Sequence, residues 1–129
     1  MDLKGVTQIS ASALRAQSLR MRVIAENLGN ADSVASSPGG MPYRRKLVTL
    51  KPEDSGVAVR SIATDKSDFQ RIYQPGHPAA DGQGYILRPN VNSLVEAADM
   101  KAAQRSYESN LNAIDAARAM TLRTIDLIK

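Results

Sequence analysis

Two long stretches of the chain carry apolar residues on one face of a helix. In the first, from about Leu3 to about Leu28, apolar positions follow one another at intervals of seven, three and four residues, which brings them to one side. These positions are Leu14, Met21, Ile24 and Leu28. Gly29 and Asn30 follow, and both residue types tolerate the left-handed backbone that commonly ends a helix. The pattern therefore predicts a first helix that ends just before Gly29.

The second stretch begins at Ser93 and runs towards Ile128. Ser93 and Glu96 are spaced as a capping box, in which the hydroxyl and the carboxylate bond to free backbone N–H groups of the first turn. A broad apolar face follows, formed by Met100, Ala103, Tyr107, Leu111, Ile114, Leu122, Ile125 and Ile128. More apolar surface lies beside it, at Ala113, Ala116 and Met120. We therefore predict a second helix that is apolar over more than one stripe.

The part between these stretches holds all six prolines and six of the eight glycines. Pro and Gly interrupt regular structure, so this part is predicted to be irregular. Within it, four short runs rich in β-branched, aromatic and aliphatic residues are bounded by turn residues, a pattern typical of hairpin strands. The runs cover residues 47–50, 57–62, 69–73 and 85–87, and turns are predicted at 74–78 and 81–84.

These elements predict a mainly α fold with a β-rich insertion. The N-terminal helix belongs to residues 1–31, the middle region of hairpins and loops to residues 32–92, and the C-terminal helix to residues 93–129. We expect the two terminal helices to form a coiled-coil-like pair, which makes one helical domain.

The predicted helices are long for a chain of this size. At about 26 and 36 residues they would measure roughly 39 and 54 Å, which exceeds the width of a compact domain of the same length. A pair of helices covers only one stripe of each, and the middle region, with fourteen charged residues and one Phe, is a poor cover for the rest. We therefore expect copies of the same chain, or similar chains, to cover the surplus apolar surface.

The composition narrows the possible chemistry. The 129 residues include no Cys and one His, which excludes disulfides, thiolate metal sites and cysteine nucleophiles and leaves little for a transition metal. We expect no cofactor. The N-terminal segment has neither an apolar run long enough to enter and span a membrane nor the pattern of a cleaved secretory signal. A chain that leaves the cytoplasm would therefore use another route.

The net charge of +4 permits weak attraction to nucleic acid or to an anionic membrane surface without requiring either. Arg44, Arg45 and Lys46 follow Tyr43 as the only basic run, which could contact phosphates but more often lies on a solvated strand edge. A basic helical module that binds nucleic acid or an anionic surface is thus the alternative function, although the charges are spread evenly. An enzyme ranks lower, because His77 between two prolines is typical of a turn and has no partners at catalytic spacing.

Two asparagines lie three residues apart at the end of the first predicted helix. Asn27 and Asn30 face the same way, with small residues beside them. One interpretation is that they end the helix through the left-handed geometry that Asn tolerates. The other is that their amides bond to neighbouring backbone where subunits pack closely. The sequence leaves both open.

Four blocks of the sequence resemble the axial proteins of the bacterial flagellum. Residues 22–32 contain the motif Asn-Leu-Gly-Asn-Ala and resemble the signature that ends the first helix in that family. Residues 38–46, residues 73–78 with 84–92, and residues 98–110 are similar to its proximal-rod members, the C-type rod proteins of the basal body. The blocks occur in order over nearly the whole chain.

This resemblance implies a structural subunit and not an enzyme. Proteins of this family are exported without a cleaved signal by the flagellar type III apparatus and polymerise into a hollow rod, which crosses the periplasm and transmits motor torque. The implied partners are other copies of the chain, other rod proteins and the export apparatus, with no nucleic acid. Terminal helices would pack in the inner tube, with the middle region outside. The residues expected at the assembly interface are Leu14, Met21, Ile24, Asn27, Leu28, Asn30, Met100, Tyr107, Asn110, Leu111 and Ile114.

Overall fold

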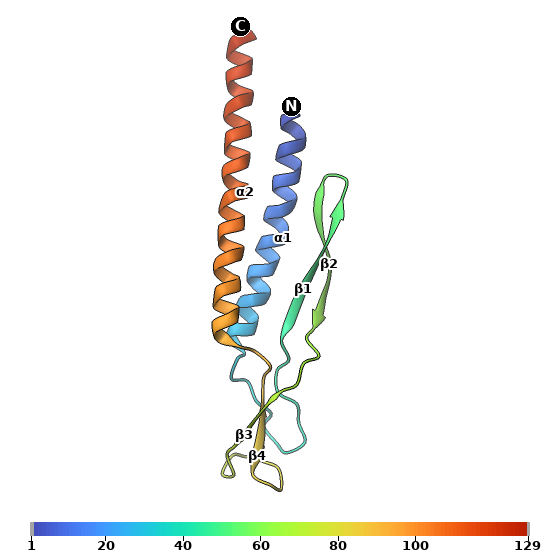
Figure 1. Cartoon of the computed structure of the whole chain (residues 1–129), viewed down its shortest axis with the longest axis vertical. Helices are drawn as coiled ribbons and strands as arrows, with labels where there is room; N and C mark the ends of the chain where they lie inside the picture. The colour runs from blue at the N-terminus through green and yellow to red at the C-terminus, as the bar shows by residue number, and fades with distance from the viewer. Residues whose placement is uncertain (1, 129) are drawn as a thin grey trace.

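Two long helices and two small antiparallel sheets make up the computed structural model, which describes residues 2–128. Figure 1 shows the helices side by side and the strands along and below them. The elements in chain order are α1 (Leu3–Gly29), β1 (Lys46–Glu53), β2 (Gly56–Thr64), β3 (Gln70–Tyr73), β4 (Tyr85–Arg88) and α2 (Ser93–Ile128). The prediction of a mainly α fold with a β-rich middle is confirmed, and all four strands fall on the predicted runs.

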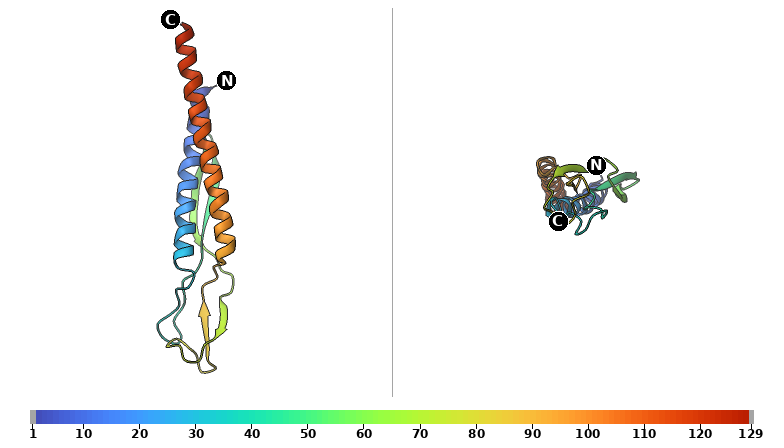
Figure 2. Two further views of the ribbon diagram at one scale, coloured as in Figure 1. Left: turned by 90° about the vertical axis from the view of Figure 1, so that its left-hand side faces the viewer. Right: turned by 90° about the horizontal axis from the view of Figure 1, so that it is seen from below.

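The helices α1 and α2 run antiparallel and pack against each other along most of α1. Small residues let the two backbones approach closely, and Ala103 and Ala117 of α2 are almost completely buried. Ile24 is the most buried of the four stripe residues of α1. The helix α2 has 36 residues against 27 in α1, so its last turns extend past the start of α1 (Figures 1 and 2). Neither helix has an apolar stretch that would span a bilayer, within residues 2–128.

The start of α2 falls where the sequence predicted it, but the predicted capping box is wrong. The side-chain oxygen of Asn92 accepts the N–H groups of Leu94 and Val95, at 3.0 and 3.3 Å, and the Asn92 carbonyl accepts that of Glu96 at 2.9 Å. Asn92 is therefore the N-cap, and Ser93 is the first helical residue. The Glu96 carboxylate points elsewhere, because it bonds to side chains from other parts of the chain.

The predicted left-handed end of α1 is also wrong. Asn30 has φ −110°, and within residues 2–128 positive φ occurs only at Gly39, Gly56 and Gly84. The side chain of Asn30 instead donates to the carbonyl of Glu26 at 2.9 Å, which also accepts the Asn30 backbone N–H at 3.1 Å. The helix α1 thus ends without a left-handed residue at Gly29 or Asn30.

The strands β1 and β2 form an antiparallel hairpin that lies along α1 (Figure 1). Its register runs from Lys46 opposite Thr64 to Glu53 opposite Gly56. At the hairpin turn, the Val57 N–H donates to the Ser12 hydroxyl at 3.1 Å, and a Cβ on Gly56 would stand 2.1 Å from the same oxygen. The hairpin therefore covers one side of α1. It packs against no part of α2, so the surplus apolar surface of α2 stays uncovered by the middle region.

The strands β3 and β4 form the second antiparallel pair, at the end of the molecule away from the two chain termini (Figure 1). Tyr73 and Tyr85 stand opposite each other, with ring centroids 5.2 Å apart in an edge-to-face arrangement. Gly84 has φ +87°, and a Cβ there would lie 2.7 Å from the Tyr73 ring. Glycine is therefore required beneath this aromatic pair.

Candidate assembly interface

Most of the residues that the sequence selected as interface positions are partly covered within the single chain. Ile24 and Asn27 are buried, and Leu111 alone is exposed. The other eight are partly covered, namely Leu14, Met21, Leu28, Asn30, Met100, Tyr107, Asn110 and Ile114. Packing within the chain thus covers part of the surface of each of these side chains and leaves the rest accessible.

Apart from Ile9 on α1, the large apolar side chains that the helices expose all lie on α2, and most of them lie near its C-terminal end. Leu127 is 87% exposed and Ile128 79% exposed. The others are Leu94, Val95, Leu111, Met120, Leu122 and Ile125. Soluble chains seldom expose so many large apolar residues on one element unless another molecule covers them. The sequence pattern included most of these residues but gave no reason to select Leu94, Val95 and Leu127.

A buried asparagine connects the two helices to the first strand. Asn27 is 1% exposed. Its side-chain oxygen accepts the Tyr43 hydroxyl at 2.7 Å and the Lys46 N–H at 2.9 Å, and its amide donates to the Lys46 carbonyl at 2.9 Å and to Glu96 at 3.3 Å. These four bonds use the full capacity of the side chain. Asn27 is therefore neither a helix cap nor a free amide for a neighbouring subunit.

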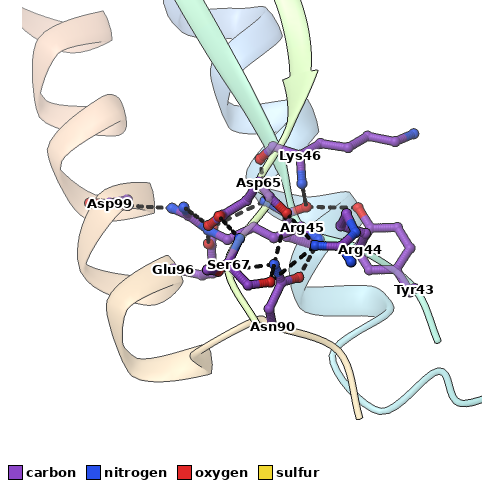
Figure 3. A network of polar contacts seen from close by, with 10 residues as sticks. Tyr43, Arg44, Arg45, Lys46, Asp65, Ser67, Asn90, Glu96 and Asp99 are labelled. Atoms are coloured by element: carbon purple, nitrogen blue, oxygen red, sulfur yellow. Dashed lines mark hydrogen bonds and ion pairs between the residues drawn. The ribbon is translucent and has the colours of Figure 1, made fainter. Parts of the chain in front are cut away.

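Beside it, Arg45 carries an ion-pair network (Figure 3). Its Nε donates to the Glu96 carboxylate, its Nη1 lies 3.2 Å from Asp65, and its Nη2 lies 3.7 Å from Asp99. The Glu96 side chain is 1% exposed, and a buried carboxylate requires such a partner. Burial lowers the pKa of Arg45, but the hydrogen bonds and charges of Glu96 and Asp65 outweigh burial and raise that pKa above its ordinary value.

The basic run is thus not the solvated strand edge that its sequence suggested. Besides Arg45, the Arg44 guanidinium donates to the carbonyls of Asp65 and Ser67, at 2.8 and 3.0 Å, and stacks 4.1 Å from the centroid of the Phe69 ring. Lys46 pairs with Glu26 at 2.7 Å. All three cations have partners in their own chain, which leaves no free basic run for phosphates.

The structure gives His77 the turn role that the sequence predicted. Its Nδ1 accepts the Ala79 N–H at 3.0 Å. In the part of the chain that the structure describes, no three His, Asp or Glu side chains gather in a way that could hold a metal ion.

Comparison with known proteins decides the family. The chain is 45% identical to the flagellar basal-body rod protein FlgC of Agrobacterium fabrum, in an alignment that covers 98% of this chain and 96% of that protein. The chain belongs to the FlgC family of flagellar basal-body rod proteins. FlgC of Salmonella typhimurium is 38% identical over 98% of both chains, and that of Bacillus subtilis is 37% identical over 94% and 95%. The family model for the C-terminal part of flagellar basal body rod FlgEFG proteins also matches, at residues 83–127.

The resemblance drawn from the four sequence blocks is therefore confirmed. The chain is a structural rod subunit of the flagellar basal body and not an enzyme, and other rod components are its assembly partners. The alternative of a module that binds nucleic acid or an anionic surface has no support from these relatives, which are all FlgC proteins.

Proposed function

We propose that this rod subunit polymerises through its terminal helices and that the resulting rod transmits motor torque. The single observation that carries this proposal is the exposed apolar surface of α2, which no other part of the described chain covers. Fully burying one Leu or Ile side chain stabilises an assembly by about 1.5–3 kcal/mol. Neighbouring helices that cover Leu122, Ile125, Leu127 and Ile128 would therefore gain several kcal/mol per subunit.

In the assembled rod, α1 and α2 act as a coiled-coil-like pair. The antiparallel packing of the helices and the small residues between them support this arrangement. The helical parts, residues 1–31 and 93–129, form the inner domain, and residues 32–92 form the outer region. Leu111 and the accessible sides of the eight partly covered interface positions contact neighbouring helices, whereas Ile24 and Asn27, which are buried in the single chain, support that surface from within.

The chain reaches the rod through the flagellar type III apparatus without a cleaved signal, and the rod section it forms lies in the periplasm. Its partners there are other copies of itself and the other rod proteins. The membership in the FlgC family supports this location, since the curated relatives are basal-body rod proteins.

An aspartate at Leu127 tests the proposal. The side chain is exposed in the single chain, so Leu127→Asp should leave the fold intact. In the polymer it would bury an unpaired carboxylate, which is strongly unfavourable. We expect loss of sedimentable polymer and loss of swimming in soft agar. Ser109→Asp adds the same charge at an exposed polar position of α2 and should assemble normally. If cells with Leu127→Asp swim as well as those with Ser109→Asp, the proposed role of α2 is wrong.

A further inference from the structure

The second sheet stands apart from the rest of the molecule. The strands β3 and β4 pack against each other but against neither helix and neither strand of the first hairpin, within the described chain. Figures 1 and 2 show this end beyond the helix pair, joined to it by crossing loop segments. We call residues 69–88 the tip, and the three segments 43–46, 65–67 and 89–92 the neck. The loop of residues 31–42 also reaches the tip, where the Asp32 carboxylate pairs with Arg88. The angle between the tip and the helices therefore depends on the neck together with this loop.

Side chains, and not a strand ladder, hold the neck together. The side-chain oxygen of Asn90 accepts the Arg45 N–H at 2.8 Å. Its amide donates to the carbonyls of Asp65 and Ser67, at 3.0 and 3.1 Å, and to the Ser67 hydroxyl at 3.1 Å. Asn90 thus bonds to both of the other neck segments, as Figure 3 shows. One backbone bond, from the Asp65 N–H to the Arg45 carbonyl at 2.8 Å, runs beside these contacts.

Arg45 fixes this cluster to the helices. Its guanidinium bonds to Asp65 in the neck and to Glu96 in the first turn of α2, and so it spans both parts of the molecule. A planar guanidinium can hold two carboxylates in a set geometry, which a lysine ammonium cannot do. Pro89 is fully buried beside the cluster, and its ring restricts the backbone where β4 leads towards α2.

We propose that the neck is a rigid joint, clamped by Arg45 and Asn90 as positioning residues, that holds the tip at one angle to the helix pair. When the Arg45 or the Asn90 side chain is removed, the tip becomes hinged while both helices stay folded, because neither helix and neither strand of the first hairpin packs against β3 or β4. The ion pair of Arg88 with Asp32 also reaches the tip, but it is exposed, and exposed ion pairs contribute little. A fixed tip lets the outer region and the helices of a subunit move as one body. The consequence for the rod, efficient transfer of torque between its inner and outer parts, rests on the function proposed above; the joint itself does not.

The absence of cysteine makes a distance measurement simple. Gly76 in the tip has open space around its Cα, and Ser109 on α2 is exposed, so Gly76→Cys with Ser109→Cys provides two sites for spin labels. For the full-length labelled chain we expect one narrow distance distribution by pulsed electron paramagnetic resonance. Arg45→Ala or Asn90→Ala should broaden it roughly twofold with unchanged helical circular dichroism. Arg45→Lys should give an intermediate width, because it restores charge without the two-carboxylate geometry.

Arg60→Ala serves as the matched control, since Arg60 lies exposed on β2 and contributes to none of the neck contacts. A broad distribution in the parent chain overturns the proposal, and so does a narrow one in both alanine variants. If Arg45→Ala lowers the helical signal, Asn90→Ala decides, because Asn90 bonds to neither helix. Failure of the assembly proposal can be distinguished from failure of the neck proposal. If the assembly proposal is wrong, cells with Leu127→Asp swim normally, whatever the width of the distance distribution.

Discussion

Replacing Asn27 by alanine should weaken the single chain more than any polar substitution on the outer faces of its helices. The change removes four hydrogen bonds and leaves the Lys46 N–H and carbonyl, the Tyr43 hydroxyl and one Glu96 oxygen without that partner. Each such bond contributes about 1 kcal/mol net, and a buried group left unpaired costs about 1–3 kcal/mol. Because several of these partners are only partly buried and regain water, we expect a loss of about 3 kcal/mol in the free energy of unfolding.

Urea unfolding followed by circular dichroism measures this loss. With a typical dependence of about 1–3 kcal/mol per molar urea, Asn27→Ala should lower the midpoint by about 1–3 M. Alanine is also the better helix former, which by itself stabilises the variant by about 0.5 kcal/mol. Asn112→Ala has the same gain in helix propensity, at an exposed position of α2 for which the structure shows no side-chain hydrogen bond. The difference in urea midpoint between the two variants therefore measures the contribution of the buried hydrogen bonds.

Equal midpoints for Asn27→Ala and Asn112→Ala would refute the reasoning, because they would mean that the buried amide contributes nothing beyond helix propensity. A parent chain with no cooperative transition would refute it as well, since the four bonds would then not order the single chain.

Three further predictions concern local features. Asn92→Ala should cost about 1 kcal/mol in the free energy of unfolding and Ser93→Ala almost nothing, by the same urea assay, because Asn92 is the N-cap. Gly56→Ala should cost about 1–3 kcal/mol through its positive φ and its contact with α1, whereas Gly76→Ala, in open space, should be nearly neutral. Hydrogen bonds from the Ser67 N–H and hydroxyl lower the pKa of Asp65, so its stabilisation is present above the pKa of the unfolded chain, near 4, and is lost as the pH falls through the lower folded pKa. Asp65→Asn should therefore reduce the drop in urea midpoint between pH 7 and pH 3.

Much of the fold could be predicted from the sequence because the signals were local. The intervals between Leu14, Met21, Ile24 and Leu28 and the long apolar pattern of α2 depend only on helix geometry. The strand runs depend on residue type and on the turns beside them. Each of these predictions was confirmed, with boundaries shifted by a few residues.

Apart from the end of α1, where the contacts are local, the errors share one physical cause, which is competition from partners distant in the chain. Glu96 has the correct spacing from Ser93 for a capping box, but Arg45, 51 residues earlier, offers its carboxylate a charged partner. A buried carboxylate gains more from a guanidinium than from a backbone N–H, so the helix takes its cap from Asn92 instead. The residues near Glu96 in the sequence do not reveal that a distant guanidinium will bind its carboxylate.

The same reasoning explains why the polar residues near the neck were misjudged. The run 44–46 looks solvent-exposed because three adjacent cations usually are, and Asn27 looks like a helix end because it stands near one. The first assignment changes because residues 65–67 and 90 lie beside the run, and the second because Tyr43, Lys46 and Glu96 bond to the Asn27 side chain. Charges and amides that face complementary groups become structural links. In this subunit, periodic apolar residues predict the elements, whereas the polar residues between the elements decide how those elements are held relative to one another.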